Sequence, residues 1–136
     1  MDPKRENIFP DALSRRVVGG HVLYAPVVRV ESGNFLFVSG LLSRNRAGEI
    51  VGAGNMAAQI RQVGENLKAA LEAAGASLSD LVRTCTFVTD IDEFFRHPDV
   101  RMEYFGALPA STTVEVRRLS HPDFMVEIEA TAVIHR

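Results

Sequence analysis

The chain has 136 residues, of which 46% are hydrophobic and 24% charged, and its formal net charge is −2. This length and hydrophobic content fit one globular domain with a single core. No apolar run approaches the ~20 residues of a membrane-spanning helix, and 15 basic against 17 acidic residues provide no excess of positive charge for nucleic-acid binding.

The first third of the sequence predicts short strands behind a polar arm. We expect residues 1–16 to form an N-terminal arm that lies over the surface or is loosely ordered, ahead of one domain over residues 17–136. Gly19-Gly20 separates two runs of β-forming residues and predicts a hairpin turn. Further strands are predicted over residues 27–30 and 35–38, and a glycine-rich loop over residues 44–54.

The clearest element is a helix that begins after Asn55, a typical N-cap residue. Apolar residues then recur every three or four positions, as on one face of a helix: Met56, Ile60, Val63, Leu67, Leu71 and Ala74. Gly75 stands where a C′ glycine ends a helix. The remaining predicted elements are a helical turn at 77–80, a strand at 83–89, a helix at 98–106 and strands at 112–119 and 125–134.

This order of elements predicts an α+β fold, a mixed sheet with helices on one face. The last strand alternates between an apolar face, which includes Val126 and Ile128, and a mixed face, which includes Glu127 and Glu129. The strands over 27–30 and 35–38 are apolar on both faces, as in sheets that are covered on both sides. One chain has too few helices for that, so we expect self-association with C3 or C2 symmetry through the second face.

Several motifs follow one another at compatible spacing. Residues 33–40 read Gly-Asn-Phe-Leu-Phe-Val-Ser-Gly, a glycine and an apolar run that end in Ser-Gly. Later motifs are Asn66-Leu67, Ala73-Ala74-Gly75, Leu81-Val82-Arg83-Thr84, Phe87-Val88-x-Asp90, Pro109–Val116 and Val126–Ala132. This ordered set resembles the Rid (YjgF/UK114) family, and the resemblance covers residues 17–134, nearly the whole chain.

The resemblance implies a chorismate-mutase-like fold, a mixed sheet with two helices on one face, that assembles as a homotrimer. It also implies three small-molecule clefts between subunits and no cofactor. The best-known members hydrolyse reactive imines and enamines to keto acids and ammonia. Others are aminomuconate deaminases, and some have been named ribonucleases or translation inhibitors.

The chain departs from the imine deaminases at positions that bind substrate in the family. Those proteins carry an arginine directly after Pro-Ala, which binds the substrate carboxylate as a bidentate fork; this chain has Ser111 there. At a position where the family often has a cysteine, this chain has Thr113. Where the family has an asparagine and a tyrosine, this chain has Pro98 and Val27. Either the ligand of this chain lacks that carboxylate, which is the interpretation we favour, or another cationic side chain binds the carboxylate. The possible surrogates are Arg101, Arg117 and Arg29.

Glu127 matches the family's glutamate in the final strand and is our candidate catalytic residue. Hydrolysis of a C=N bond needs a positioned water and a group that transfers a proton, and a carboxylate can serve both needs. The alternative for Glu127 is an ion pair with an arginine across a subunit interface. The candidate substrate-binding residues are Ser39, Gly40, Ser111, Thr113 and Arg101.

Other chemistry has little support in the sequence. The four histidines lie in separate segments without ligand spacing, so we predict no metal site. Cys85 lies within a strand without a matched base, and we expect it to be a buried small hydrophobic side chain. A single cysteine and the absence of a signal-peptide pattern indicate the cytoplasm.

Two functions remain open at this point. The first is a cofactor-free deaminase or hydrolase that acts on the C–N bond of an enamine or imine with a non-standard structure, for example an aminomuconate-type intermediate. The second is a non-catalytic trimer that binds a small metabolite and acts as a sensor or partner protein. Retention of Glu127 favours the first, and Ser111 in place of the arginine favours the second or an unusual substrate.

Overall fold

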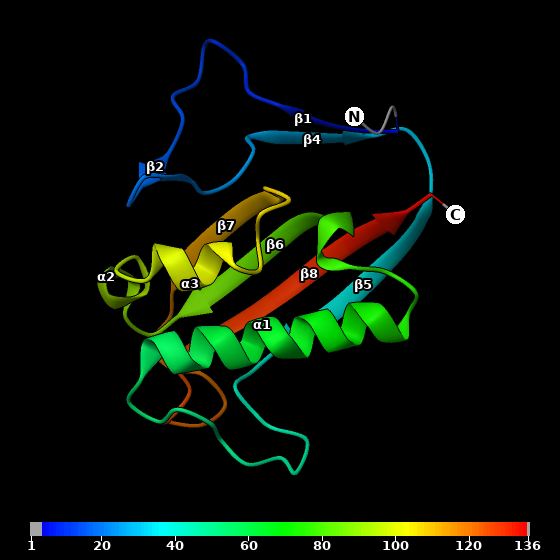
Figure 1. Cartoon of the computed structure of the whole chain (residues 1–136). Coiled ribbons are helices and arrows are strands. Elements are labelled where there is room, and N and C mark those ends of the chain that lie inside the picture. Colours follow the sequence, from blue (N-terminus) through cyan, green and yellow to red (C-terminus); the bar gives the residue numbers. More distant parts are fainter. Residues whose placement is uncertain (1–3, 136) are drawn as a thin grey trace.

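A four-stranded mixed sheet with helices packed on one face forms the centre of the molecule (Figure 1). The structure is a computed structural model and describes residues 4–135. The strands lie in the order β5 (Asn34–Leu41), β8 (Val126–Ile134), β6 (Leu81–Val88) and β7 (Ala110–Glu115). β8 is antiparallel to both neighbours, and β6 and β7 are parallel. The predicted α+β class with a mixed sheet is confirmed.

The long helix α1 (Met56–Ala73) begins and ends as its sequence predicts. The Asn55 side chain accepts a hydrogen bond from the backbone N–H of Ala58 and so caps the first turn. At the other end Gly75 adopts φ +79°, and the N–H groups of Gly75 and Ala76 donate to the carbonyls of Glu72 and Leu71. This pair of bonds is a Schellman motif, which satisfies carbonyls that the helix itself leaves free.

The core lies between α1 and the sheet. Along β8 the alternate residues Val126, Ile128, Ala130 and Ala132 are buried and belong to the same cluster as the apolar face of α1. Ile60 and Leu67 are completely buried there. The alternation predicted for the last strand is therefore confirmed, and it fixes which face of the sheet is left without helices.

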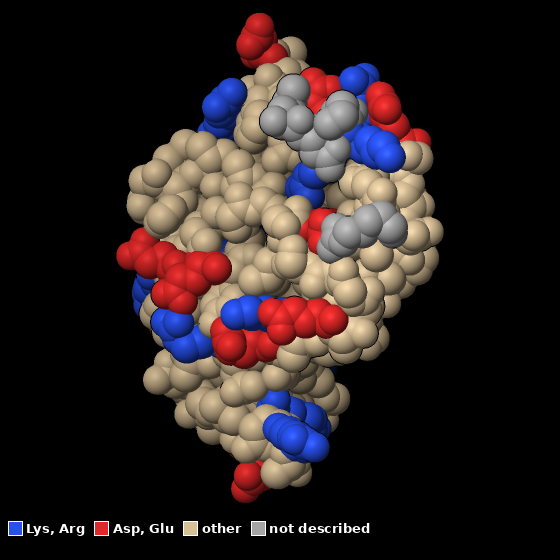
Figure 2. Space-filling model, turned by 45° about the vertical axis from the view of Figure 1, so that its right-hand side comes forward, with Lys and Arg blue, Asp and Glu red and all other residues tan. Residues whose placement is uncertain are grey.

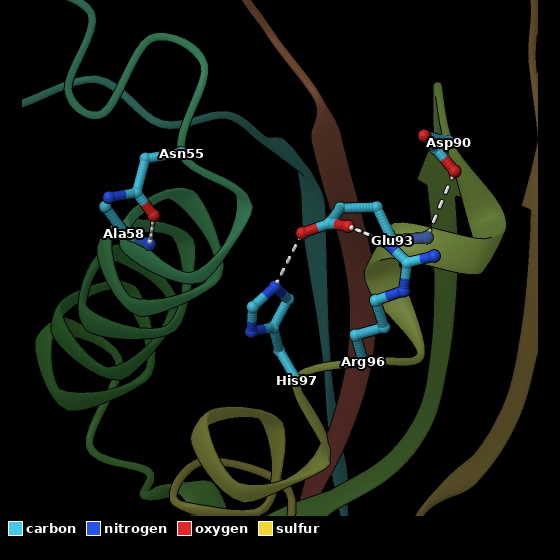
Figure 3. A network of polar contacts seen from close by, with 6 residues as sticks. All are labelled: Asn55, Ala58, Asp90, Glu93, Arg96 and His97. Atoms are coloured by element: carbon cyan, nitrogen blue, oxygen red, sulfur yellow. Dashed lines mark hydrogen bonds and ion pairs between the residues drawn. The ribbon is translucent and has the colours of Figure 1, made fainter.

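Two short helices, α2 (Ile91–Phe94) and α3 (Pro98–Met102), follow β6 and are held by a polar network (Figure 3). Asp90 accepts from the backbone N–H of Glu93 and caps α2. The Glu93 carboxylate contacts Arg96 Nη1 at 2.8 Å and His97 Nε2 at 3.0 Å. These contacts lower the pKa of Glu93, and the hydrogen bond with His97 has the largest effect. The network ties the two helices together.

Two predicted elements are shorter than expected. The helix predicted over 98–106 ends at Met102, because the chain turns there toward Leu108, which has a positive φ of 53°. The strand predicted over 112–119 ends at Glu115, because its neighbour β6 ends at Val88. One further bond, from Val116 N–H to the Val88 carbonyl, closes the ladder. The 3₁₀ helix η1 (Leu78–Asp80) matches the predicted helical turn.

The described part of the N-terminal arm is attached to the domain. β1 (Arg5–Ile8) pairs with β4 (Val27–Val30), and the predicted Gly-Gly hairpin joins β2 (Val17–Val18) to β3 (His21–Val22). In Figure 1 the β1–β4 ribbon lies beyond β7. The Arg5 and Asn7 side chains donate to the carbonyl of Ala107 at 3.0 and 2.9 Å. The boundary at residue 17 stays a prediction.

The second face of the sheet carries exposed apolar side chains, which we call the open face. Phe35 and Phe37 of β5 are 58% and 79% exposed, and Val114 of β7 is 38% exposed. Cys85 is paired with Glu129 on this face and is half-buried, so the expectation of a buried core cysteine is wrong for the single chain. Within residues 4–135 no helix has the length and apolar character needed to cross a membrane.

Candidate functional site

The proposed site residues form two groups on opposite faces of the sheet. Residues paired across neighbouring strands lie on the same face. Glu127 is paired with Phe87, on the open face. Ser111 is paired with Thr84 on the helix side, and the Thr84 hydroxyl donates to Ser111 Oγ at 3.1 Å. Because Thr113 is two residues further along β7, it shares the side of Ser111, so one chain does not bring Glu127 together with them.

The first group is Glu127 with Gly40. β5 is irregular between Val38 and Leu41, where its pairing with β8 shifts register. This irregularity brings the Gly40 backbone so close to Glu127 that a Cβ at position 40 would lie 2.8 Å from Cδ of the carboxylate. Glu127 is half-buried, and its carboxylate accepts no hydrogen bond within the described part of the chain. Ser39 is exposed beside this group. A half-buried carboxylate with open coordination can position a water molecule and transfer its proton.

The second group lines a cavity of about 260 Å³ between β7 and the α2–α3 segment. Arg101, Ser111 and Thr113, three of the predicted substrate-binding residues, come together here. Phe95 adds an aromatic wall. Pockets for drug-sized ligands are typically about 300–1,000 Å³, so this cavity suits a small metabolite.

Arg101 is the electrostatically unusual residue of this cavity. It is only 7% exposed, and its Nη1 is buried without a hydrogen-bond partner among the residues described. Its guanidinium carbon lies 5.5 Å from the ring centre of Phe94 and 5.9 Å from that of Phe95. Burial, and after it the like charge of Arg16, lower the pKa of Arg101 to about 10, against an opposing effect of Tyr24. The cavity thus holds a cation that has no anionic partner in the described part of the chain.

Among the residues that line this cavity, sequence reasoning missed two polar ones, Arg16 and Tyr24. Arg16 belongs to the arm and its guanidinium carbon lies 5.0 Å above the Phe95 ring. The paired arginines at 15 and 16 were visible as a charged feature, but nothing in the local pattern indicates that the arm folds back to α2. Tyr24 follows the Gly-Gly hairpin, three residues before Val27.

The other candidate arginines lie elsewhere. Arg29 is on β4 and pairs with Glu6 at 2.7 Å. Arg117 lines a separate groove with His121. Of the three surrogates considered from the sequence, Arg101 alone shares the cavity with Ser111.

Metal and nucleic-acid chemistry find no added support in the described residues. Among residues 4–135 no three His, Cys, Asp or Glu side chains gather as a metal site would require. On the face drawn in Figure 2, basic and acidic side chains lie beside one another and form no continuous basic band.

The family model described as Endoribonuclease L-PSP matches residues 20–134. The chain belongs to this family, the YjgF/RutC/Rid family. A RutC family protein of Pyrococcus horikoshii is 45% identical over 105 residues, 76% of this chain and 82% of the relative. A 2-iminobutanoate/2-iminopropanoate deaminase of Dermatophagoides farinae is 35% identical over 136 residues and covers 98% of this chain and 99% of its own.

Solved structures agree on the fold. A Rid family protein of unknown function from Yersinia pestis superposes with a TM-score of 0.84 at 31% identity and covers 96% of this chain and 99% of its own. A structure named as a putative endoribonuclease, from Thermotoga maritima, has a TM-score of 0.70 at 40% identity and covers 83% of this chain and 87% of its own. The predicted family membership is confirmed.

Proposed function

We propose that the chain is a cofactor-free hydrolase that deaminates a small imine or enamine in clefts between the subunits of a homotrimer. The observation that carries this proposal is Glu127, a half-buried carboxylate beside the Gly40 backbone that no described donor engages. The relatives support it, because proteins of Escherichia coli and Dermatophagoides farinae, at 38% and 35% identity, are named 2-iminobutanoate/2-iminopropanoate deaminases.

The placement of the two groups supports a site that is shared between chains. Glu127 and the cavity around Arg101 lie on opposite faces of one sheet, so a second copy is needed to bring them to one ligand. The exposed Phe35 and Phe37 supply an apolar surface for that copy to cover. A contact between two different surfaces of the same chain is head-to-tail, and it forms a ring, such as a trimer, when the rotation between neighbouring copies closes.

The chemistry assigned to Glu127 is proton transfer in two steps. Water adds across the C=N bond, so that its oxygen bonds to carbon while one of its protons passes through the carboxylate to nitrogen. The C–N bond then breaks as the hydroxyl proton passes by the same route to nitrogen. The products are a carbonyl compound and ammonia, and no oxidant or reductant is needed.

The experiment compares Glu127→Gln with Glu129→Gln, a matched control on the same strand and face. Ammonia release is followed from 2-iminopropanoate generated in situ, with the oligomeric state checked by light scattering. We expect Glu127→Gln to lower the catalysed rate about 10²–10⁴-fold and Glu129→Gln to leave it within a few fold. Equal rates for wild type and Glu127→Gln would overturn the assignment.

The second candidate is a non-catalytic metabolite-binding trimer, which the unpaired Arg101 in its cavity favours. Saturable binding of a small anion, together with no acceleration of imine hydrolysis by the wild type, would decide for this alternative.

A further inference from the structure

Two guanidinium groups approach one aromatic ring in the cavity behind β7. The guanidinium carbons of Arg16 and Arg101 lie 5.0 and 5.9 Å from the ring centre of Phe95. Each cation gains from the ring face, but the two positive charges repel one another. The Arg16 carbonyl accepts from the Leu23 N–H, but its guanidinium makes no hydrogen bond or ion pair with any described residue. Nη1 of Arg101 is buried without a partner in residues 4–135.

Among the residues that the structure describes, no carboxylate lines this cavity to compensate the two charges. The polar groups there besides the arginines are hydroxyls, those of Tyr24, Ser111 and Thr113. A buried charge without a partner is unfavourable, and a second cation beside it adds to the cost. A bound anion would remove both penalties, because guanidinium groups form paired hydrogen bonds with carboxylates.

We infer that Arg16 and Arg101 together form an anion subsite, and that it takes a small organic dicarboxylate. Two cations without anionic partners are matched best by a ligand with two negative charges. The hydroxyls of Ser111 and Thr113 can orient the polar atoms of the ligand that lie between its two carboxylates. Arg16 precedes residues 20–134, which match the family model, so the N-terminal arm supplies a ligand contact from outside the segment that this model matches.

This inference deepens the proposed function, on which it rests for the reaction: the substrate would be the imine or enamine of a dicarboxylic acid. Binding itself does not depend on catalysis. The proposed reaction and the anion subsite can therefore be refuted separately, since Glu127→Gln should lose turnover and keep its affinity for the anion.

The probes are succinate and butanoate, which have the same number of carbons and differ by one carboxylate. Isothermal titration calorimetry on the full chain measures the affinity of each for the wild type, Arg101→Met, Arg16→Met and Arg15→Met. Arg15 is the matched control, because it is the neighbouring arginine of the arm but lies 4.4 Å over the Phe9 ring and does not line the cavity.

We expect wild type to bind succinate at least tenfold more tightly than butanoate. Arg101→Met should lose at least tenfold in succinate affinity, Arg16→Met should lose most of the preference for succinate, and Arg15→Met should match the wild type. Arg16 is exposed, so its variant keeps the test valid if Arg101→Met fails to fold. No saturable succinate binding, or equal losses in Arg15→Met and Arg16→Met, would overturn the inference.

Discussion

Replacement of Arg101 by methionine should make the ligand-free protein more stable. A pKa of about 10 in place of an ordinary 12.5 corresponds to roughly 3 kcal/mol of unfavourable free energy for the charged form. Methionine keeps an unbranched apolar stem and carries no charge. It gives up the contacts of the cation with Phe94 and Phe95, which are worth about 0.5–2 kcal/mol. The expected net gain is therefore about 1–3 kcal/mol.

The pH dependence follows from the direction of the pKa change. The folded protein holds this proton less tightly than the unfolded chain, so the penalty is present in full below the folded pKa of about 10. It fades only as the pH rises toward the pKa of the unfolded chain. Arg101→Met should thus keep the same advantage over wild type between about pH 6 and 9.

The assay is urea unfolding followed by far-ultraviolet circular dichroism at one fixed protein concentration, because the chain has no tryptophan. Saturating succinate should raise the stability of wild type by more than that of Arg101→Met, since the stabilisation by a ligand falls as its affinity falls. Arg15→Met serves as the control for removal of an arginine. If Arg101→Met without ligand is less stable than wild type by 1 kcal/mol or more, Arg101 has a structural partner and the reasoning is refuted.

Three further substitutions test the packing, the site and the network. Gly40→Ala places a methyl group against Glu127 and should lower imine turnover at least tenfold, with a change in unfolding free energy below about 1 kcal/mol; unchanged turnover would contradict the contact. Gly64→Ala sets a Cβ 2.6 Å from Tyr104 Cδ2 and should destabilise the fold by about 1–3 kcal/mol in urea unfolding, whereas a gain in stability would show that the ring moves freely. The lowered pKa of Glu93 contributes stability at neutral pH that is lost as the pH falls through that pKa. Glu93→Gln should therefore show a smaller drop in melting temperature below about pH 4.5 than wild type, and equal drops would count against the network.

Local rules predicted the elements that depend on neighbouring residues. Asn55 and Gly75 marked the ends of α1 because caps depend on a few adjacent backbone groups. The alternation of β8 identified its helix-facing side, because that period is a property of the strand alone. The ends of β7 were not predictable in this way, since they depend on where β6 stops.

The site was predicted in part. Glu127 and Ser111 were identified through a resemblance in local motifs, but the motifs do not show that the two lie on opposite faces of one sheet. Arg16 could not be identified, because its place beside Phe95 results from the path of the arm over α2. Arg101 was considered as a surrogate, and the cavity now favours a relocated cation over a ligand without a carboxylate.

The central claim is that one active cleft needs the Glu127 group of one chain and the Arg101 group of another. Its most direct test mixes Glu127→Gln and Arg101→Met subunits by joint refolding and measures ammonia release from the imine of aspartate. Each variant alone should be nearly inactive. In a random one-to-one mixture of a head-to-tail trimer, roughly one quarter of the clefts would combine an intact Arg101 with an intact Glu127, so the mixture should recover about that fraction of the wild-type rate. A mixture no more active than its two parents would contradict the shared cleft.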